Sequence, residues 1–396
     1  MESLTGASPK RPDMLDTIDG LRERNLSRLL EKGNAKLIGV YCTYCPTELV
    51  IASGAVAIGL CGTREKPIAA AEKDLPRNLC PLIKSSYGFA VSDTCPFFRA
   101  SDMVIGETTC DGKKKMFEIL KSKGIKDVYV MNLPQMPDEE ESVQLWVAEL
   151  RRLRSYLENR YDVAITDDKI REAIAITNEH TRAKKELLDL NKQRPALIRG
   201  LDLMNVSWQM GFQIDPRETN RLLRKLTAEI REKALAGYEV GNLHTKRILL
   251  TGTPVGVGSE KVLKLVEETG ALVVAMENCG GYKTVDLLVE ETDQDDPLVL
   301  LARKYMKIPC SVMTPNRRRL DLLRRMVRDF KIDGVIDLDW QACLTYNVES
   351  YFVSDLVRGE LGLPFLQLET DYSQSDMETL RVRIEAFLET VVAGDA

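Results

Sequence analysis

Short apolar runs alternate with amphipathic stretches in two separate parts of the chain. Near the start, the runs 37–41, 56–60 and 103–106 are each followed by a stretch with helical spacing of its apolar residues. The same alternation returns with runs at 247–251 and 335–338. Short apolar runs separated by helical stretches predict buried parallel strands with crossover helices. We therefore expect an α/β protein.

The middle of the chain has a different pattern. From 138 to about 236, long helical runs rich in Arg, Glu and Leu carry few strand signals. We predict two Rossmann-like α/β domains with mostly parallel sheets, at 1–137 and 246–396, joined by a helical segment at 138–245. An amphipathic helix is predicted over 11–33, ahead of the first strand.

Composition and charge exclude several function classes. Charged residues make up 29% of the 396 residues and the formal net charge is -5, so we expect no nucleic-acid partner. The first residues lack the apolar segment of a secretion signal, and no run of ~18 apolar residues predicts a membrane span. We expect a cytoplasmic protein, whose nine cysteines are thiols rather than structural disulfides.

Two triplets of cysteine lie in the two α/β parts of the chain. Successive members are roughly 30–40 residues apart, which is about one strand–helix step. Because the carboxyl ends of parallel strands meet at one edge of a sheet, the three thiols of a triplet can converge on one point. The two triplets, each expected to form one corner of a metal site, are Cys42, Cys80 and Cys110, and Cys279, Cys310 and Cys343.

The types of residue available as metal ligands indicate which kind of metal site is expected. His180 and His244 lie far from any cysteine in the sequence and are expected on the surface, and only Cys42 and Cys45 have the Cys-x-x-Cys spacing of a zinc ribbon. Thiolates without imidazole favour iron–sulfur clusters. The alternative is that these cysteines are buried apolar residues, as free cysteines commonly are.

The other residues of these loops have less specific interpretations. Cys45 is expected to pack or to lie behind the ligands, Cys95 is expected behind the ligands, and Cys61 is expected in the core or in a loop. Replacement of one of the six ligands by Cys45 or Cys95 stays open. The lysine run 113–115 is a candidate docking surface and equally a solvated helix face. Polar residues that are candidates for proton handling, and equally for structural roles, are Glu48, Glu107, Lys283 and Tyr346.

The cysteine loops resemble those of one superfamily. The segments 41–49 (YCTYCPTEL), 80–85 (CPLIKS) and 108–115 (TTCDGKKK) look like the 2-hydroxyacyl-CoA dehydratase and benzoyl-CoA reductase superfamily, in which three such cysteines hold a [4Fe-4S] cluster. This chain departs from the dehydratases by carrying three further cysteine loops. Together with the segment 93–98, these loops make it similar to the double-cubane cluster proteins of anaerobes, and they lie at 277–283, 308–311 and 340–347.

The resemblance implies a cofactor, an activity and partners. It implies a low-potential reductase of small unsaturated molecules such as acetylene, a homodimer, and electrons delivered by a separate iron–sulfur activator ATPase. Three thiolates leave one iron of a four-iron cube without a protein ligand, so two facing cubes can share a sulfide in the cleft between the domains. The implied cofactor is an [8Fe-9S] double-cubane cluster, with Cys42, Cys80 and Cys110 on one cubane and Cys279, Cys310 and Cys343 on the other.

Two alternative functions stay open at this point. One is a 2-hydroxyacyl-CoA dehydratase-like subunit with a single [4Fe-4S] cluster on Cys42, Cys80 and Cys110. The other is a non-catalytic iron–sulfur carrier. Iron content separates the first alternative from a double cubane, at about four against about eight irons per chain. Substrate turnover with activator and ATP separates the carrier from both.

A glycine-rich segment at 251–261 follows a strand and opens a helix. It fits neither the GxxxxGK[ST] pattern nor the GxGxxG pattern, so we interpret it as a tight turn rather than a nucleotide site.

We therefore predict that the isolated chain neither binds ATP tightly nor hydrolyses it, because it lacks a phosphate-binding loop of either pattern. Titration calorimetry with ATP and magnesium measures this directly. Micromolar binding to the chain alone would show that the segment 251–261 is a nucleotide site after all.

Overall fold

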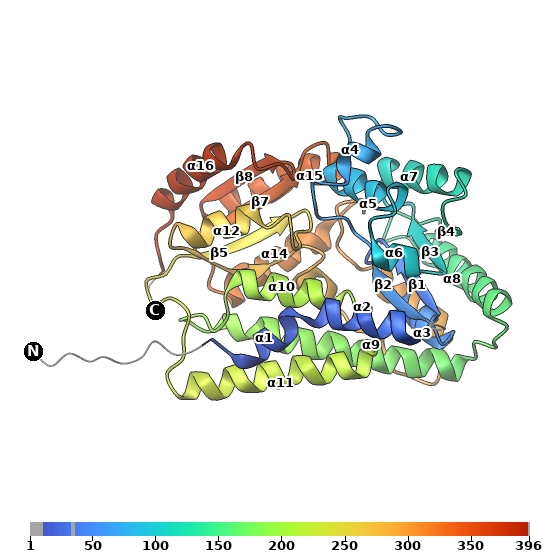
Figure 1. Cartoon of the computed structure of the whole chain (residues 1–396). Helices are drawn as coiled ribbons and strands as arrows, with labels where there is room; N and C mark the ends of the chain where they lie inside the picture. The colour runs from blue at the N-terminus through green and yellow to red at the C-terminus, as the bar shows by residue number, and fades with distance from the viewer. Residues whose placement is uncertain (1–10, 33–35, 395–396) are drawn as a thin grey trace, which may run out of the picture.

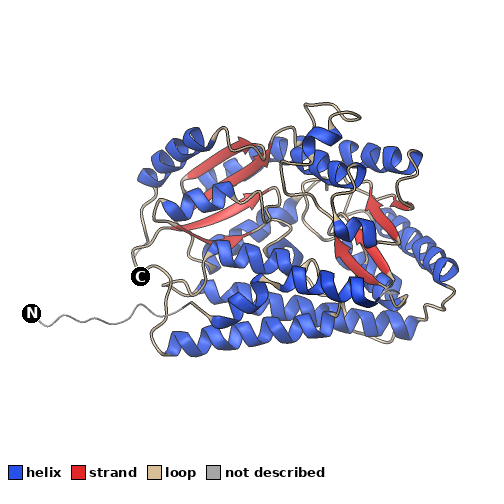
Figure 2. Cartoon of the chain, in the orientation of Figure 1, coloured by secondary structure: helices blue, strands red, loops and turns tan. Residues whose placement is uncertain are grey.

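Two parallel sheets stand on a shared layer of helices in this computed structural model, which describes residues 11–32 and 36–394 (Figure 1). Strands of the two sheets lie apart from one another, with long helices running beneath both (Figure 2). The predicted class, two Rossmann-like α/β units with parallel sheets, is confirmed. Along the described part of the chain, no helix is long and apolar enough to cross a membrane.

The first sheet has the strand order β2-β1-β3-β4, and all its neighbouring strands are parallel. Its inner strand β3 is buried along its whole length, as expected for a parallel strand covered on both faces. The strands are β1 (Leu37–Val40), β2 (Val56–Gly59), β3 (Met103–Glu107) and β4 (Val128–Met131). The helices around it are α3 (Thr47–Ala52), α4 (Ile68–Ala71), α5 (Pro81–Val91), α6 (Pro96–Ala100) and α7 (Asp111–Ser122).

The second sheet repeats this topology with the order β6-β5-β7-β8. In each sheet the first strand along the chain is central and lies between the second and the third. The strands are β5 (Arg247–Gly252), β6 (Leu272–Met276), β7 (Gly334–Trp340) and β8 (Phe365–Thr370). Around them lie α12 (Lys261–Glu268), α13 (Pro297–Tyr305), α14 (Arg317–Asp329), α15 (Leu344–Ser354) and α16 (Met377–Thr390), with a short 3-10 helix η2 (Tyr282–Thr284) and a π-helix η3 (Asp355–Glu360).

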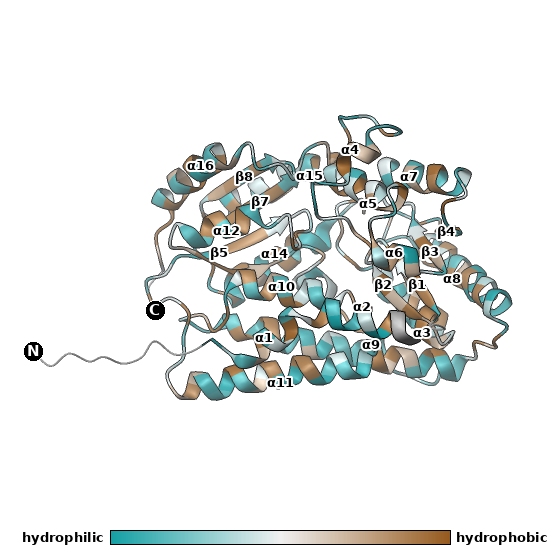
Figure 3. Cartoon of the chain, viewed as in Figure 1, coloured by the Kyte–Doolittle hydropathy of each residue, from teal (hydrophilic) through white to brown (hydrophobic). Residues whose placement is uncertain are grey.

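The helices that lie between the two sheets in the sequence pack against elements of both units. Helix α9 contacts α3 of the first unit, α8 contacts α13 of the second unit, and α10 contacts β6. Apolar and polar residues alternate along α11, as expected for a helix with one buried face (Figure 3). These helices are α8 (Glu140–Tyr161), α9 (Asp167–Leu188), η1 (Asp189–Lys192), α10 (Gly200–Met210) and α11 (Pro216–Leu235).

The single helix predicted over 11–33 is instead two helices. α1 (Asp13–Asp19) and α2 (Leu21–Lys32) are broken at Gly20, a residue with a low helix propensity. Residue 33 lies outside the described residues. Helix α1 packs against α10 and α11, so the start of the chain joins the helical layer.

The prediction that both histidines lie on the surface holds for His244, whereas His180 is only partly exposed. His180 of α9 packs against α11, and its Nδ1 lies 3.0 Å from the side-chain amide of Asn220. Burial, assisted by the nearby Lys184 cation, lowers the pKa of His180 to about 4. The imidazole is therefore neutral at pH 7.

We predict that His180 makes the fold sensitive to mild acid. Its pKa is about 4 when folded and ~6.5 when unfolded, so between these values the unfolded chain binds the extra proton and stability falls as pH falls. The loss between pH 7 and pH 5 should be about 1–2 kcal/mol. Urea midpoints at the two pH values measure it, and His180→Gln should reduce the difference; an unchanged difference in the variant would exclude this role.

Candidate metal centre

Both cysteine triplets lie in the loops beyond the carboxyl ends of the strands. Cys42 follows β1, and Cys80 and Cys110 occupy the N-caps of α5 and α7. In the second unit Cys279 follows β6, Cys343 occupies the N-cap of α15, and Cys310 lies between α13 and α14. Three of the six thiols thus stand at helix N-termini, where the positive end of the helix dipole favours a thiolate. Within the described residues, all nine cysteines are free.

Direct contacts between the two units hold these loops together. The Tyr44 hydroxyl donates to the carbonyl of Ile308 at 2.9 Å, beside Cys310. The Thr63 hydroxyl donates at 2.8 Å to the carbonyl of Val257, which lies in the glycine-rich turn. A Cβ on Gly252 would lie 2.3 Å from the carbonyl oxygen of Leu338, so the glycines of this turn serve close packing.

Charge interactions join thiols of the first unit to thiols of the second. Cys42 is close enough to Cys279 and Cys310 for their charges to raise its pKa, after the larger effect of burial. A hydrogen bond between Cys80 and Cys343 lowers the pKa of Cys80 and raises that of Cys343. Cys110 interacts with Cys80, Cys343 and Cys310. Thiols of one sequence triplet therefore interact with thiols of the other.

Cys61 is an exposed cysteine in the loop after β2. It follows β2 as Cys279 follows β6, so the two cysteines occupy equivalent places in the two sheets. The Cys61 thiol donates to the carbonyl of Tyr41 at 2.9 Å and is close enough to Cys279 to affect its pKa. By contrast, the Cys95 sulfur accepts a hydrogen bond from the N–H of Phe98 and caps α6, which is a structural role.

Two buried lysines supply positive charge to the thiols. Lys113 donates from Nζ to the carbonyl of Tyr41 at 2.7 Å, and its charge lowers the pKa of Cys42 against the larger effect of burial. Lys283 acts in the same way on Cys279, whose pKa burial nevertheless raises to about 11. Buried anions are costly without a nearby cation, so these lysines stabilise negative charge on the sulfur atoms.

Burial of Lys113 corrects the docking hypothesis for the run 113–115. Lys113 is buried and cannot meet a partner. Lys114 and Lys115 are exposed, but they form ion pairs with Asp111 and Glu118 on the same helix. Three consecutive lysines resemble a solvated face, yet helical geometry turns the first of them inward.

Tyr346 and Lys283 form a polar chain that reaches Cys310. The Lys283 Nζ donates to the Tyr346 hydroxyl at 2.6 Å, and that hydroxyl lies 4.0 Å from the Cys310 sulfur. Lys283 also pairs with Glu277 at 3.2 Å. Arg319 lies over the Tyr346 ring, 5.0 Å from its centroid, and pairs with Glu277. The tyrosine hydroxyl is thereby held facing the sulfur.

The two glutamates proposed for proton handling have different surroundings. Glu48 accepts hydrogen bonds from Thr177 and Tyr305, so it links α3 to α9 and α13. Glu107 is fully buried, and neither of its carboxylate oxygens has a hydrogen-bond partner among the described residues. Burial raises the pKa of Glu107 to about 8, despite the opposing charge of Lys113. Glu107 therefore holds a proton near neutral pH.

The donor chemistry of these residues suits an iron–sulfur cluster. No three His, Cys, Asp or Glu side chains in the described ranges lie close enough to hold one metal ion. A four-iron cube is wider than an ion and keeps its thiolates farther apart. The six thiols, the absence of histidine from both triplets and the two buried lysines all suit an anionic cluster.

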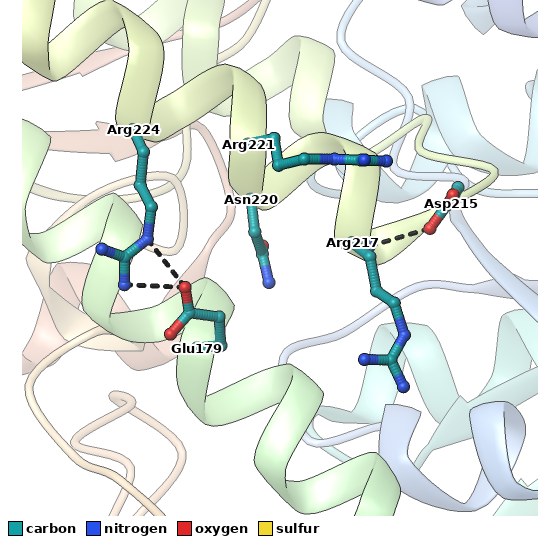
Figure 4. Close-up of a pocket in the computed structure, with 6 residues that line it drawn as sticks. All are labelled: Glu179, Asp215, Arg217, Asn220, Arg221 and Arg224. Atoms are coloured by element: carbon teal, nitrogen blue, oxygen red, sulfur yellow. Dashed lines mark hydrogen bonds and ion pairs between the residues drawn. The ribbon is translucent and has the colours of Figure 1, made fainter.

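A surface hollow of about 340 Å³ lies elsewhere, between α9 and α11 (Figure 4). Its walls are charged, and two of the arginines that line it already have ion-pair partners: Arg224 pairs with Glu179 and Arg217 with Glu172. It contains no cysteine and is lined by Glu179, Asp215, Arg217, Asn220, Arg221 and Arg224. We assign it no part in the metal centre.

We predict that Gly281 is required for the loop that carries Cys279. A Cβ at Gly281 would lie 2.0 Å from the Met276 carbonyl oxygen, whereas at Gly280 the nearest atom is 3.5 Å away. Gly281→Ala should therefore lower the free energy of unfolding by about 1–3 kcal/mol. Gly280→Ala is the matched control and should cost less than about 0.5 kcal/mol. Denaturant titration compares the two, and equal stabilities would show that the loop adjusts freely.

Known proteins resemble this chain along most of its length. A family model described as "2-hydroxyglutaryl-CoA dehydratase, D-component" matches residues 42–391. The chain is 43% identical to the "Putative dehydratase subunit YjiM" of Escherichia coli (strain K12), over 91% of this chain and 92% of that protein. It is 24% identical to the "(R)-phenyllactyl-CoA dehydratase beta subunit" of Clostridium sporogenes, over 96% and 98%. It is 20% identical to a benzoyl-CoA reductase subunit of Thauera aromatica, over 90% and 91%. The chain therefore belongs to the 2-hydroxyglutaryl-CoA dehydratase D-component family, within the 2-hydroxyacyl-CoA dehydratase and benzoyl-CoA reductase superfamily.

Proposed function

We propose that this chain is a cytoplasmic, low-potential iron–sulfur reductase of small unsaturated molecules such as acetylene. The observation that carries the proposal is the convergence of six thiols from both sheets beside two buried lysines. The cofactor would be an [8Fe-9S] double-cubane cluster. Its proposed ligands are Cys42, Cys80, Cys110, Cys279, Cys310 and Cys343.

The proximity of the thiols favours a particular division between the two cubanes. Each cubane would take thiols from both sheets, so that the cluster ties the two units together. One group is Cys42, Cys279 and Cys310, and the other is Cys80, Cys110 and Cys343. The sequence expectation, in which each unit holds a cubane of its own, is the alternative division.

When bound, the cluster would supply single electrons at low potential to a substrate in the cleft. The protein's own residues would set the surroundings of that chemistry. Lys113 and Lys283 would balance negative charge on the sulfur atoms. Tyr346 would direct its hydroxyl at the Cys310 sulfur, and Glu107 would hold a proton on its carboxyl group.

The proposed partners follow from what the chain lacks and from its relatives. Low-potential electrons require energy input, and the sequence carries neither common phosphate-binding pattern. We therefore propose a separate iron–sulfur activator ATPase as electron donor. Relatives are named as subunits, which supports assembly with other chains. The assembly that we propose is a homodimer.

A second candidate is supported by the names of those relatives. Two of the three are dehydratase subunits, so a dehydratase-like subunit with a single [4Fe-4S] cluster is the alternative reaction. Anaerobic iron and sulfide analysis separates them, at about four irons per chain against about eight. A chain with eight irons but no turnover of acetylene or an acyl-CoA, in the presence of activator and ATP, would be an electron carrier.

We predict that Cys279→Ser, Cys310→Ser and Cys343→Ser each lower the iron content and abolish activator-dependent reduction, because each removes one proposed ligand. Cys95→Ser is the matched control, since Cys95 caps a helix and should leave iron unchanged. Iron per chain and electron paramagnetic resonance of the reduced protein provide the measurements.

The spectra also test how the thiols are divided. Cys42→Ser and Cys279→Ser should disturb one cubane signal, and Cys80→Ser and Cys343→Ser the other. Full iron and activity in all three of the Cys279, Cys310 and Cys343 variants would exclude the double cubane.

A further inference from the structure

Helix α15, which begins directly after Cys343, carries a stripe of exposed apolar side chains. Leu344 is 73% exposed, Val348 69%, Tyr351 74% and Phe352 56%. Their spacing of four, seven and eight residues from Leu344 places them on one face of the helix. We call these four residues the α15 stripe.

The four exposed apolar side chains of the α15 stripe lie together on one helix, unlike exposed apolar residues elsewhere on the surface. Single exposed apolar residues are normal, whereas contiguous patches mark interaction sites. In the rest of the described chain, large exposed apolar residues are dispersed over several helices and loops: Met136, Leu145, Leu235, Leu243, Leu288, Val382 and Val392.

The opposite face of α15 is firmly anchored. Tyr346, Ser350 and Val353 are buried. The one acidic side chain of the helix, Glu349, bonds to Arg319 and Asn316. The outward face therefore carries no charge, and the helix cannot turn its stripe into the core without breaking these bonds.

The area of the stripe approaches that of a stable interface. An aromatic side chain buries ~150–250 Å², so Tyr351 and Phe352 with their two aliphatic neighbours offer several hundred Å². A specific interface needs ~800 Å² from each partner. The stripe therefore supplies most of the core of such an interface, and the surrounding surface supplies the rim.

We propose that the α15 stripe is the centre of a two-fold contact with a second copy of this chain. A two-fold contact joins one patch to the same patch, so the patch must be complementary to itself. An uncharged apolar helix face meets that requirement. Permanent interfaces are also more apolar than transient ones, while an electron donor that docks and leaves depends on charge steering.

This inference rests on the homodimer of the proposed function and adds the surface that forms it. It does not depend on which cluster the thiols hold. Because α15 starts at Cys343, the contact would place the second copy beside the rim of the metal centre.

The test is the mass of the full chain in solution, by light scattering over a range of concentrations. The wild type should have twice the chain mass of 44.6 kDa. Val348→Asp and Tyr351→Asp should each weaken the dimer by roughly 100-fold or more, because each buries an unpaired charge at the centre of the contact. Val382→Asp on α16, also exposed and apolar, is the matched control and should remain a dimer.

A charge-swap experiment tests the two-fold geometry. Val348 lies near the middle of the stripe, so it should meet its own copy across the axis. Mixing Val348→Asp with Val348→Lys should restore a dimer that neither variant forms alone. Circular dichroism and iron content, measured on the same samples, should match those of the wild type because the replaced side chains are exposed in the single chain.

Two results would overturn the inference, and they differ in meaning. Dimers of wild-type mass in both Asp variants would leave the homodimer intact and reject the α15 stripe as its interface. A wild-type chain that stays monomeric, or that dimerises only with a different protein, would reject the homodimer itself. Neither result changes the iron content on which the cluster proposal is tested.

Discussion

Negative charge enclosed between two sheets is the constraint on which the rest of this structure depends. A buried anion costs several kcal/mol unless a cation or hydrogen-bond donors lie beside it. The chain meets this requirement twice, with Lys113 in the first unit and Lys283 in the second. Each lysine follows a buried glutamate by six residues, Glu107 and Glu277, with a cysteine between them. The spacing is the same in the two units but the charge state differs, because Glu277 pairs with Lys283, whereas the Glu107 carboxyl holds a proton and Lys113 donates to the carbonyl of Tyr41.

The second unit reinforces this arrangement with Arg319. Its guanidinium pairs with Glu277 and Glu349 and donates to the Thr251 hydroxyl. These partners belong to three different elements of the second unit. The loop of Cys279 and the helix after Cys343 are consequently held by one buried cation. Such a network is stabilising only while every partner is present, so it fixes the loops in one arrangement.

Much of the fold can be predicted from the sequence because parallel strands leave a strong local signal. The apolar runs 37–41, 103–106 and 247–251 are strands in the structure, and the class is as expected. Periodicity alone does not reveal the break at Gly20 in the helix predicted over 11–33, since the apolar spacing continues across that residue. The partial burial of His180 depends on α11, far along the chain, and local sequence carries no trace of it.

In the candidate site too, the sequence predicts features that depend on neighbouring residues better than contacts between distant ones. Spacing selects the six cysteines as candidates, but it does not reveal that the charge of Cys310 in the second unit acts on Cys42 in the first. Lys113 resembles a surface residue in the sequence because it belongs to a run whose other two members are exposed. The repeated interval from Glu107 to Lys113 and from Glu277 to Lys283 is a signal available in the sequence. It becomes meaningful only once both pairs are seen to be buried.

The repeated strand order of the two sheets has one further consequence. The equivalence between the units fails after the central strands, where Cys42 follows β1 but a glycine turn follows β5. The repeated strand order places Cys61 after β2 where Cys279 follows β6, but Cys61 is not one of the proposed ligands. If an electron acceptor made of two identical halves were bound here, the two halves would be surrounded by different residues. The halves would differ in electron affinity, and that difference would give electron flow through the molecule a direction.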